Sequence, residues 1–184
     1  MTLEKNPPRI ADRYEPVTPT IAEELRGIVG EPYVLYDEPR AMEDYAHDEV
    51  AGEEHAHMPE AVVKPASAEE ISQILKLANQ ERIPVTPRGA GSGLSCGAVP
   101  VYGGIVLSVE RMNRILEIDR ENMVAVVEPG VVTNDVNEAI EEYGLFYAGY
   151  PMSVELCFVG GNVAENAGGG RAIKYGVTGR YVLG

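Results

Sequence analysis

Two glycine-rich segments, residues 87–97 and 160–170, constrain the fold of this chain more than any other feature. Each follows an apolar run typical of a strand, and glycine weakens both strand and helix interiors. The first segment has glycine at alternate positions, so a ligand can approach the backbone and successive N–H groups can converge on an anion. We therefore expect a pyrophosphate-binding loop, with the Ser92 hydroxyl as an extra donor and Arg88 as a charge partner.

The first segment matches neither of the two familiar phosphate-binding loops. A Walker A loop requires Gly-Lys-Ser/Thr, and this segment contains no lysine. A Rossmann fingerprint requires G-x-G-x-x-G at the start of a helix, whereas here the spacing is G-x-G-x-G and the chain runs through further glycines toward a strand. A flexible connection without a ligand is the alternative interpretation of this segment taken alone.

The second segment repeats the glycine pattern after the apolar residues 156–159. It adds Asn162 and Asn166, whose amides both donate and accept hydrogen bonds. Such uncharged groups suit the rim of a flavin ring or a ribityl chain better than a metal. A glycine-rich surface turn is the alternative here.

Composition narrows the possible partners. The 184 residues allow one ordinary domain or two small lobes, and the formal net charge of -14 disfavours binding to nucleic acid or anionic lipid. We find no signal peptide and no transmembrane segment, and we expect a cytoplasmic protein. Cys96 and Cys157 have no cysteine or histidine at ligand spacing, which predicts free thiols.

The beginning of the chain predicts a loose arm and one short helix. Residues 1–19 are polar and rich in proline, which predicts a flexible N-terminal arm. Thr20 and Glu23 form a capping-box pattern, which predicts a helix that begins there and ends at Gly30. We expect residues 32–59 to be irregular, with one or two short strands or turns.

The next segment predicts a strand-helix-strand unit. Residues 61–64 and 83–86 have strand character. Between them, Ser67 and Glu70 form a second capping box, and the apolar residues 71, 74, 75 and 78 share one helical face that ends near residue 81. Short connections of this kind favour parallel pairing of the two strands.

The remaining predicted elements depart from strict alternation of strands and helices and therefore indicate an α+β fold. Residues 105–109, 115–119 and 123–127 predict strands, and residues 128–130 predict a turn. Thr133 or Asn134 is expected to cap a helix whose buried side carries residues 136, 139, 140 and 143, and Gly144 ends it.

These motifs resemble the FAD-linked oxidases that share the fold of vanillyl-alcohol oxidase and p-cresol methylhydroxylase (PCMH). The resemblance rests on residues 84–100, 128–130 and 157–184, and it is greatest for the branch of the glycolate oxidase FAD subunit, D-lactate dehydrogenase and D-2-hydroxyglutarate dehydrogenase. It implies a PCMH-type FAD-binding domain of two small α+β lobes with a mixed sheet. We expect this domain to span residues 61–184, after the arm at 1–19 and a helical and irregular segment at 20–60.

The resemblance also implies a set of cofactor contacts. The first loop would hold the FAD pyrophosphate, and the second would line the ribityl chain and the ring. The implied contacts are Arg88, Gly89, Ala90, Gly91, Ser92, Gly93 and Leu94 in the first group, and Pro151, Ser153, Gly160, Gly161, Asn162, Asn166 and Gly168 in the second. Some relatives bind the flavin covalently through a histidine at the position of Ser92, so we expect non-covalent FAD.

The chain departs from the family pattern at two places. Cys96 stands where this branch usually has glycine, and residues 149–152 lack the acidic or small polar residue that usually precedes the proline. His55 and His57 lie beside two glutamates, but two histidines without a fixed scaffold favour a solvated loop over a metal site. Arg171 and Lys174 fit a surface turn better than a site for a substrate carboxylate.

The resemblance implies an oxidoreductase, of which this chain would be the N-terminal portion. Residues 181–184 look like a strand interrupted in its middle, so we expect a C-terminally truncated domain. The parent protein would oxidise a 2-hydroxy acid such as glycolate or D-lactate to the 2-oxo acid and pass electrons to a partner subunit. We identify no catalytic residue and expect no turnover by this chain alone. A non-catalytic binding module, or a reductase of the UDP-N-acetylmuramate-forming type, is the alternative.

Overall fold

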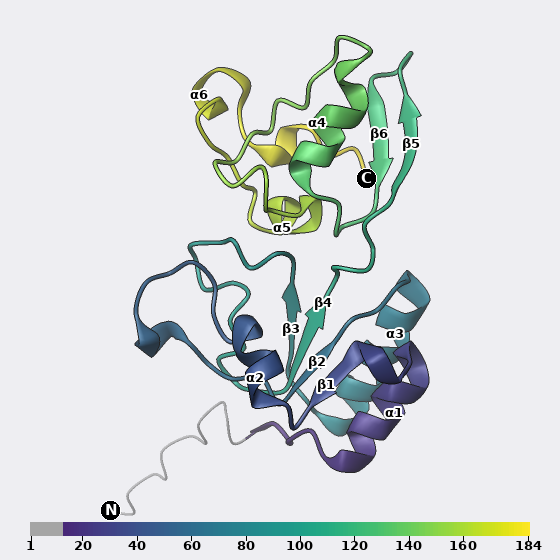
Figure 1. The fold of residues 1–184 in the computed structure, drawn as a ribbon, viewed down its shortest axis with the longest axis vertical. Helices are drawn as coiled ribbons and strands as arrows, with labels where there is room; N and C mark the ends of the chain where they lie inside the picture. Colours follow the sequence, from purple (N-terminus) through teal and green to yellow (C-terminus); the bar gives the residue numbers. More distant parts are fainter. Residues whose placement is uncertain (1–12) are drawn as a thin grey trace, which may run out of the picture.

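The computed structural model describes residues 13–184, which form two lobes (Figure 1). The first lobe contains a four-stranded sheet with helices, and the second contains a two-stranded hairpin with short helices. The mixed α+β class is therefore confirmed. Within residues 13–184, no helix has both the length and the apolar character needed to cross a membrane.

The sheet of the first lobe has the order β1-β2-β4-β3. Its strands are β1 (Val34–Tyr36), β2 (Ala61–Val63), β3 (Val85–Arg88) and β4 (Ile105–Ser108). β2 and β3 both run parallel to β4, and β1 pairs antiparallel with β2. The sheet is thus mixed, as expected.

The predicted direct pairing of the strands on either side of the long helix is wrong. β2 and β3 are parallel, but β4 lies between them and pairs with both. All four residues of β4 are buried, which is typical of a central strand, whereas β3 at the edge is only partly buried. Burial on both faces therefore selects the more apolar strand for the central position.

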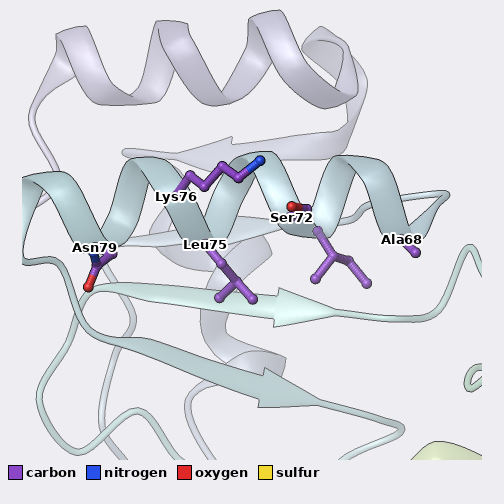
Figure 2. Close-up of a pocket in the computed structure, with 6 residues that line it drawn as sticks. Ala68, Ser72, Leu75, Lys76 and Asn79 are labelled. Carbon is purple, nitrogen blue, oxygen red and sulfur yellow. The ribbon is translucent and has the colours of Figure 1, made fainter.

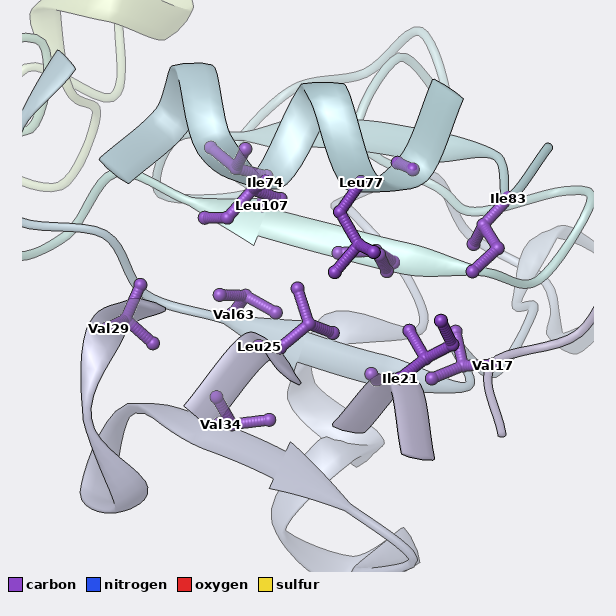
Figure 3. Close-up of a cluster of buried hydrophobic side chains, with 13 residues drawn as sticks. Val17, Ile21, Leu25, Val29, Val34, Val63, Ile74, Leu77, Ile83 and Leu107 are labelled. Carbon is purple, nitrogen blue, oxygen red and sulfur yellow. The ribbon is translucent and has the colours of Figure 1, made fainter. Parts of the chain in front are cut away.

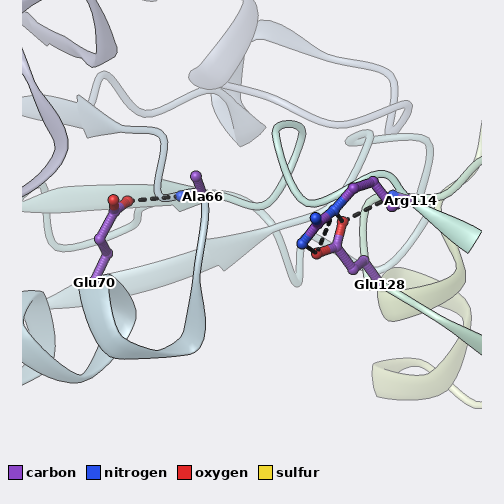
Figure 4. Close-up of polar contacts among 4 residues, drawn as sticks. All are labelled: Ala66, Glu70, Arg114 and Glu128. Carbon is purple, nitrogen blue, oxygen red and sulfur yellow. Dashed lines mark hydrogen bonds and ion pairs between the residues drawn. The ribbon is translucent and has the colours of Figure 1, made fainter. Parts of the chain in front are cut away.

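Two helices, α1 (Pro19–Val29) and α3 (Ala68–Glu81), pack on one face of this sheet (Figures 1 and 3). The predicted cap of α3 is confirmed, because the Ser67 hydroxyl accepts from the Glu70 N–H at 3.2 Å. The Glu70 carboxylate reaches back to the Ala66 N–H at 2.7 Å (Figure 4). For α1 the prediction was wrong: Thr18, rather than Thr20, caps the helix.

The core lies between these helices and the sheet (Figure 3). Leu25, Ile74 and Ile105 are fully buried there. The predicted helical face was wrong at Leu75, which is 47% exposed and lines a shallow surface depression on α3 with Lys76 and Asn79 (Figure 2). Leu77 is buried instead.

Residues before β2 belong to the same core as those after it. Ile21 and Leu25 of α1 pack with Val63 of β2, so the core crosses the boundary expected at residue 60. Val17 is also buried, which shows that the expected loose arm does not extend to Pro19. The first part of that arm, residues 1–12, lies outside the described residues.

The segment between α1 and β2 contains only short elements, as predicted. Besides β1, these are η2 (Glu31–Tyr33), α2 (Pro39–Met42), η3 (Glu43–Tyr45) and η4 (Glu53–His55). Met42 packs with Val62 and Val106 in a small second cluster on the sheet.

The second lobe begins with an antiparallel hairpin. Its elements are β5 (Ile115–Asp119), β6 (Val124–Val127), α4 (Thr133–Glu141), α5 (Val159–Ala164), α6 (Ala172–Tyr175) and η5 (Thr178–Arg180). Neither Thr133 nor Asn134 caps α4: the N-cap is Val132, which has no side-chain cap. Residues 181–184 form no strand, so that prediction was wrong as well.

Candidate cofactor-binding cleft

A cleft of about 630 Å³ is formed by both glycine-rich segments. Its volume lies within the ~300–1,000 Å³ typical of small-molecule sites. Every cofactor contact that the sequence analysis implied lines this cleft: Arg88, Gly89, Ala90, Gly91, Ser92, Gly93, Leu94, Pro151, Ser153, Gly160, Gly161, Asn162, Asn166 and Gly168. Two segments more than sixty residues apart in sequence therefore meet at one site.

The first glycine-rich segment leaves β3 at Arg88 and forms one wall of the cleft. Gly91 has φ +75°, a conformation that L side chains rarely adopt. The backbone N–H groups of residues 90–95 donate to no acceptor among the described residues. Because unpaired N–H groups need a hydrogen-bond partner, this wall can offer several donors to an anion in the cleft.

The Arg88 guanidinium does not serve as a free cation at this wall. Arg88 is 7% exposed, and its Nη1 and Nη2 donate to the carbonyl oxygens of His47 and Asp44, both at 2.7 Å. Its guanidinium also lies 5.5 Å from the centre of the Tyr45 ring. Burial lowers the pKa of Arg88 from its ordinary value. One N–H of each terminal nitrogen is thus bound by the segment before β2.

Gly91 is required because Arg88 passes directly beside it. A Cβ at residue 91 would lie 2.0 Å from Nη2 of Arg88. Since Arg88 is held by two carbonyl oxygens, it has little room to move. The left-handed backbone and the close arginine together explain glycine at this position.

The second segment lies against the first. It includes α5, where residues 160 and 161 are neighbours with different surroundings. A Cβ on Gly160 would lie 2.7 Å from Cβ of Pro129, whereas a Cβ on Gly161 would meet nothing within 4 Å. A Cβ on Gly89 would lie 3.5 Å from Cα of Gly161, so the two segments are in van der Waals range. Gly160 is therefore needed for packing, and Gly161 leaves open space in the cleft.

The two asparagine amides, which the sequence analysis assigned to the cofactor, have partners within the protein. Asn162 is 4% exposed, and its Nδ2 donates to the Thr133 hydroxyl at 2.6 Å. The Oδ1 atom of Asn166 accepts from the Gly179 N–H at 2.8 Å. These bonds join the second segment to α4 and η5.

The turn at residues 128–130 connects the hairpin to the cleft. Glu128 accepts hydrogen bonds from the Arg114 backbone N–H at 2.8 Å and from Arg114 Nη2 at 2.7 Å (Figure 4). Hydrogen bonds from the Arg114 side chain lower the pKa of Glu128. A Cβ on Gly130 would lie 2.2 Å from the Val109 carbonyl oxygen, so the turn also packs tightly on the end of the first lobe.

Sequence reasoning missed Asp48 as a member of the cleft. Its side chain is buried, with Oδ2 accepting from the Cys96 N–H at 2.8 Å and Oδ1 accepting from the Val50 N–H at 3.0 Å. Nothing distinguishes Asp48 in the sequence, because it lies in an irregular stretch with many acidic residues. Cys96 has φ 59°, which accounts for a position where glycine is the easier choice.

The electrostatic character of the cleft follows from these contacts. Among the described residues that line it, Arg88 is the only Lys or Arg, and the carboxylates are Asp48 and Glu165. Ser95 donates to the Glu165 carboxylate, with oxygens at 2.6 and 2.8 Å, and so links the two glycine-rich segments. An anion in the cleft would consequently depend on backbone N–H groups rather than on a free side-chain cation.

Other residues singled out in the sequence lie elsewhere. His55 and His57 are exposed, and within residues 13–184 no group of three His, Cys, Asp or Glu side chains could hold a metal ion. Arg171 is exposed and lies 4.2 Å from the centre of the Tyr150 ring. Neither Arg171 nor Lys174 lines the cleft.

Comparison with known proteins identifies the family. The family described as FAD binding domain matches residues 59–184. Glycolate oxidase subunit GlcD of Bacillus subtilis is 47% identical over 140 residues, which cover 76% of this chain and 29% of that protein. A D-lactate dehydrogenase of Anaerostipes hadrus is 44% identical over 170 residues, covering 92% of this chain and 35% of the relative. The chain therefore spans about a third of the length of these relatives.

Solved structures agree with the fold. An alkyldihydroxyacetonephosphate synthase superposes with a TM-score of 0.80 at 21% identity, covering all of this chain and 36% of the other. p-Cresol methylhydroxylase superposes with a TM-score of 0.67 at 28% identity, covering 79% of this chain and 29% of the other. The chain is a PCMH-type FAD-binding domain and belongs to the FAD binding domain family.

Proposed function

We propose that the cleft binds FAD without a covalent bond, and that the parent protein oxidises a 2-hydroxy acid of the glycolate or D-lactate type to the 2-oxo acid. One observation carries the proposal: both glycine-rich segments meet at one cleft, where the N–H groups of residues 90–95 have no acceptor within the described protein. The names of the relatives, glycolate oxidase and D-lactate dehydrogenase, support the substrate class.

The residues of the cleft fit this cofactor. The first segment would hold the pyrophosphate through backbone N–H groups, which suits a cleft whose arginine is already occupied. Gly161 leaves open space where a side chain would otherwise project, and Gly89 lies within van der Waals range of it. A flavin ring needs apolar surroundings, which Val109, Pro129 and Phe158 supply.

The protein and the cofactor divide the chemistry between them. When bound, FAD supplies a ring that accepts the two electrons removed from a hydroxy acid. The described residues bind and orient that group, and the apolar lining excludes water from it. We assign no general base to this chain, and we propose that the electrons leave to a partner subunit.

Ser92 supports non-covalent attachment. A serine hydroxyl lacks the imidazole through which some related enzymes bind flavin, and the cleft holds no histidine among its described lining residues. Denaturing the FAD-loaded chain and filtering it should therefore release all the yellow colour into the filtrate. Colour that stays with the protein would contradict this part of the proposal.

The cofactor site is tested by titrating the purified chain with FAD and following flavin fluorescence and visible absorption. The wild-type chain should bind FAD with a saturable change, and Gly161→Leu should abolish it by filling the open space. Gly27→Leu is the matched control, because Gly27 also lies in a helix and a Cβ there meets nothing within 4 Å. If both variants bind FAD as the wild type does, FAD does not occupy this cleft.

A further inference from the structure

The segment of residues 44–50, which we call the strap, lies outside the region that the family comparison matches. It is hydrogen-bonded to the first glycine-rich segment at both ends. Arg88 donates to the carbonyl oxygens of Asp44 and His47, as described above. At the far end, the Glu49 N–H donates to the Gly93 carbonyl oxygen at 3.0 Å, and Asp48 accepts from the Cys96 N–H at 2.8 Å.

Asp48 is the side chain of the strap that holds the far end of the glycine loop. It is 6% exposed, and each carboxylate oxygen accepts one backbone N–H. A carboxylate has only acceptors, so it can satisfy two donors at once, whereas an amide offers one acceptor oxygen and one donor nitrogen. The Cys96 N–H that it binds belongs to a residue with φ 59°, a backbone that an L residue adopts only when its surroundings hold it.

The geometry points to Asp48 as a positioning residue for the FAD pyrophosphate. The strap holds residue 88 at one end of the loop and residues 93 and 96 at the other, so the backbone between them has few ways to rearrange. The N–H groups of residues 90–95 therefore stay together as a set of donors before the cofactor arrives, which lowers the entropic cost of binding. Asp48 acts through the backbone of the loop, not on the reacting atoms.

This inference rests on the proposed FAD site, but the effect of the strap on the loop can also be measured in the protein without FAD. Without the Asp48–Cys96 bond, the end of the loop should open more often and its amides should exchange faster with solvent. A purely global role in stability would instead speed exchange across the sheet of the first lobe. The position of the change therefore separates positioning from general stabilisation.

The test compares Asp48→Asn with Asp44→Asn in the full chain. Both changes remove one negative charge from the strap, but Asp44 is exposed and contacts Arg88 through its backbone carbonyl, which the substitution keeps. We expect Asp48→Asn to weaken FAD binding about 10- to 100-fold, the loss of one buried hydrogen bond to a charged group. We expect Asp44→Asn to bind FAD as the wild type does.

The second measurement is hydrogen–deuterium exchange of the same variants without FAD. Asp48→Asn should exchange faster in the peptide that covers residues 89–97, with β2 and β4 unchanged. Unaltered FAD affinity of Asp48→Asn, or faster exchange throughout β2 and β4, would overturn the positioning role. If the wild-type chain binds no FAD at all, the proposed function fails instead, and the exchange result still tells whether Asp48 anchors the loop.

Discussion

The two glycine-rich segments form one cleft, yet they use glycine for different physical reasons. In the first, Gly91 adopts a left-handed backbone, and the N–H groups around it have no acceptor within the described protein. In the second, Gly160 and Gly169 are pressed against the backbone or ring of neighbouring turns. The first segment is thus open toward a ligand, whereas Gly160 and Gly169 of the second are required by close packing.

The difference shows that glycine content alone does not locate ligand contacts. At a packed glycine, any added side chain should lower the stability of the fold. An open glycine should tolerate a methyl group in the fold but lose affinity for what enters the cleft. Substitutions to alanine separate the two cases.

The largest effect is expected for Gly169→Ala. A Cβ there would lie 2.2 Å from the Tyr150 carbonyl oxygen and 3.0 Å from the Met152 nitrogen, both of them backbone atoms. We expect the free energy of unfolding to fall by about 3 kcal/mol, measured by urea denaturation. Gly170→Ala is the control, because its nearest neighbour would be the Met152 sulfur at 3.8 Å. Equal stability of the two variants would show that the turn at Tyr150 moves to accommodate the methyl group.

Alanine substitutions at the adjacent residues Gly160 and Gly161 should change the free energy of unfolding in opposite directions. Gly160→Ala places a methyl group 2.7 Å from Cβ of Pro129 and should lower the free energy of unfolding by about 2 kcal/mol. Gly161→Ala meets nothing within 4 Å and should raise it by up to ~1 kcal/mol, because alanine favours the helix. Urea denaturation checks both values.

The Gly161→Ala variant should lose FAD affinity in spite of its stability. Its methyl group projects into the open part of the cleft, and we expect binding to weaken about tenfold, or ~1.4 kcal/mol. Fluorescence titration with FAD measures this. Retained affinity together with raised stability would place Gly161 away from the cofactor.

Gly91→Ala should also lower the free energy of unfolding. Alanine with a left-handed backbone costs about 1–2 kcal/mol, and Arg88 must shift from the carbonyl oxygens of the strap. Thermal unfolding of the protein without FAD measures this loss of stability. Gly93→Ala is the control, since its Cβ would lie 3.9 Å from Asp48 and its φ is not in the left-handed region. A Gly91→Ala variant as stable as Gly93→Ala would mean that Arg88 moves freely.

The smallest effect concerns the turn that supports Gly160. The lowered pKa of Glu128 means that its contribution to stability is complete above the ordinary value of 4.5 and is lost as the pH falls through the lowered pKa. The difference in melting temperature between the wild type and Glu128→Gln should therefore disappear in acid. Glu117→Gln, an exposed change on the same hairpin, should show no such pH dependence. A difference that does not shrink as the pH falls further below 4.5 would exclude the Arg114–Glu128 interaction as its source.

Local patterns predicted most elements of the fold. Ser67 and Glu70 cap α3 because the signal lies within four residues, and the two strands of the hairpin match their apolar runs. The position of β4 was missed, because periodicity tells which residues form a strand and not which strand becomes its neighbour. The short helix α5 was also missed, since its glycines disfavour a helix and the contacts that hold it, with Pro129 and Thr133, come from residues distant in the sequence.

The residues of the candidate site were predictable, but their contacts were not. Alternating glycines indicated a loop that a ligand can approach, and all implied residues line the cleft. The partners of Arg88 are backbone carbonyls more than forty residues away, which no side-chain pattern records. Asp48 was missed for the same reason: its function in the structure depends on the N–H of Cys96, and any residue except proline has one.

The central position of β4 also sets an order of events during synthesis. β2 and β3 leave the ribosome before β4, and each lacks its parallel neighbour until residues 105–108 have emerged. Until then α3 has only part of a sheet to cover, and the open edges of β2 and β3 are free to pair with other nascent chains. Slow emergence of residues 105–108 should therefore favour aggregation, whereas a pause after these residues have left the ribosome gives the first lobe time to close.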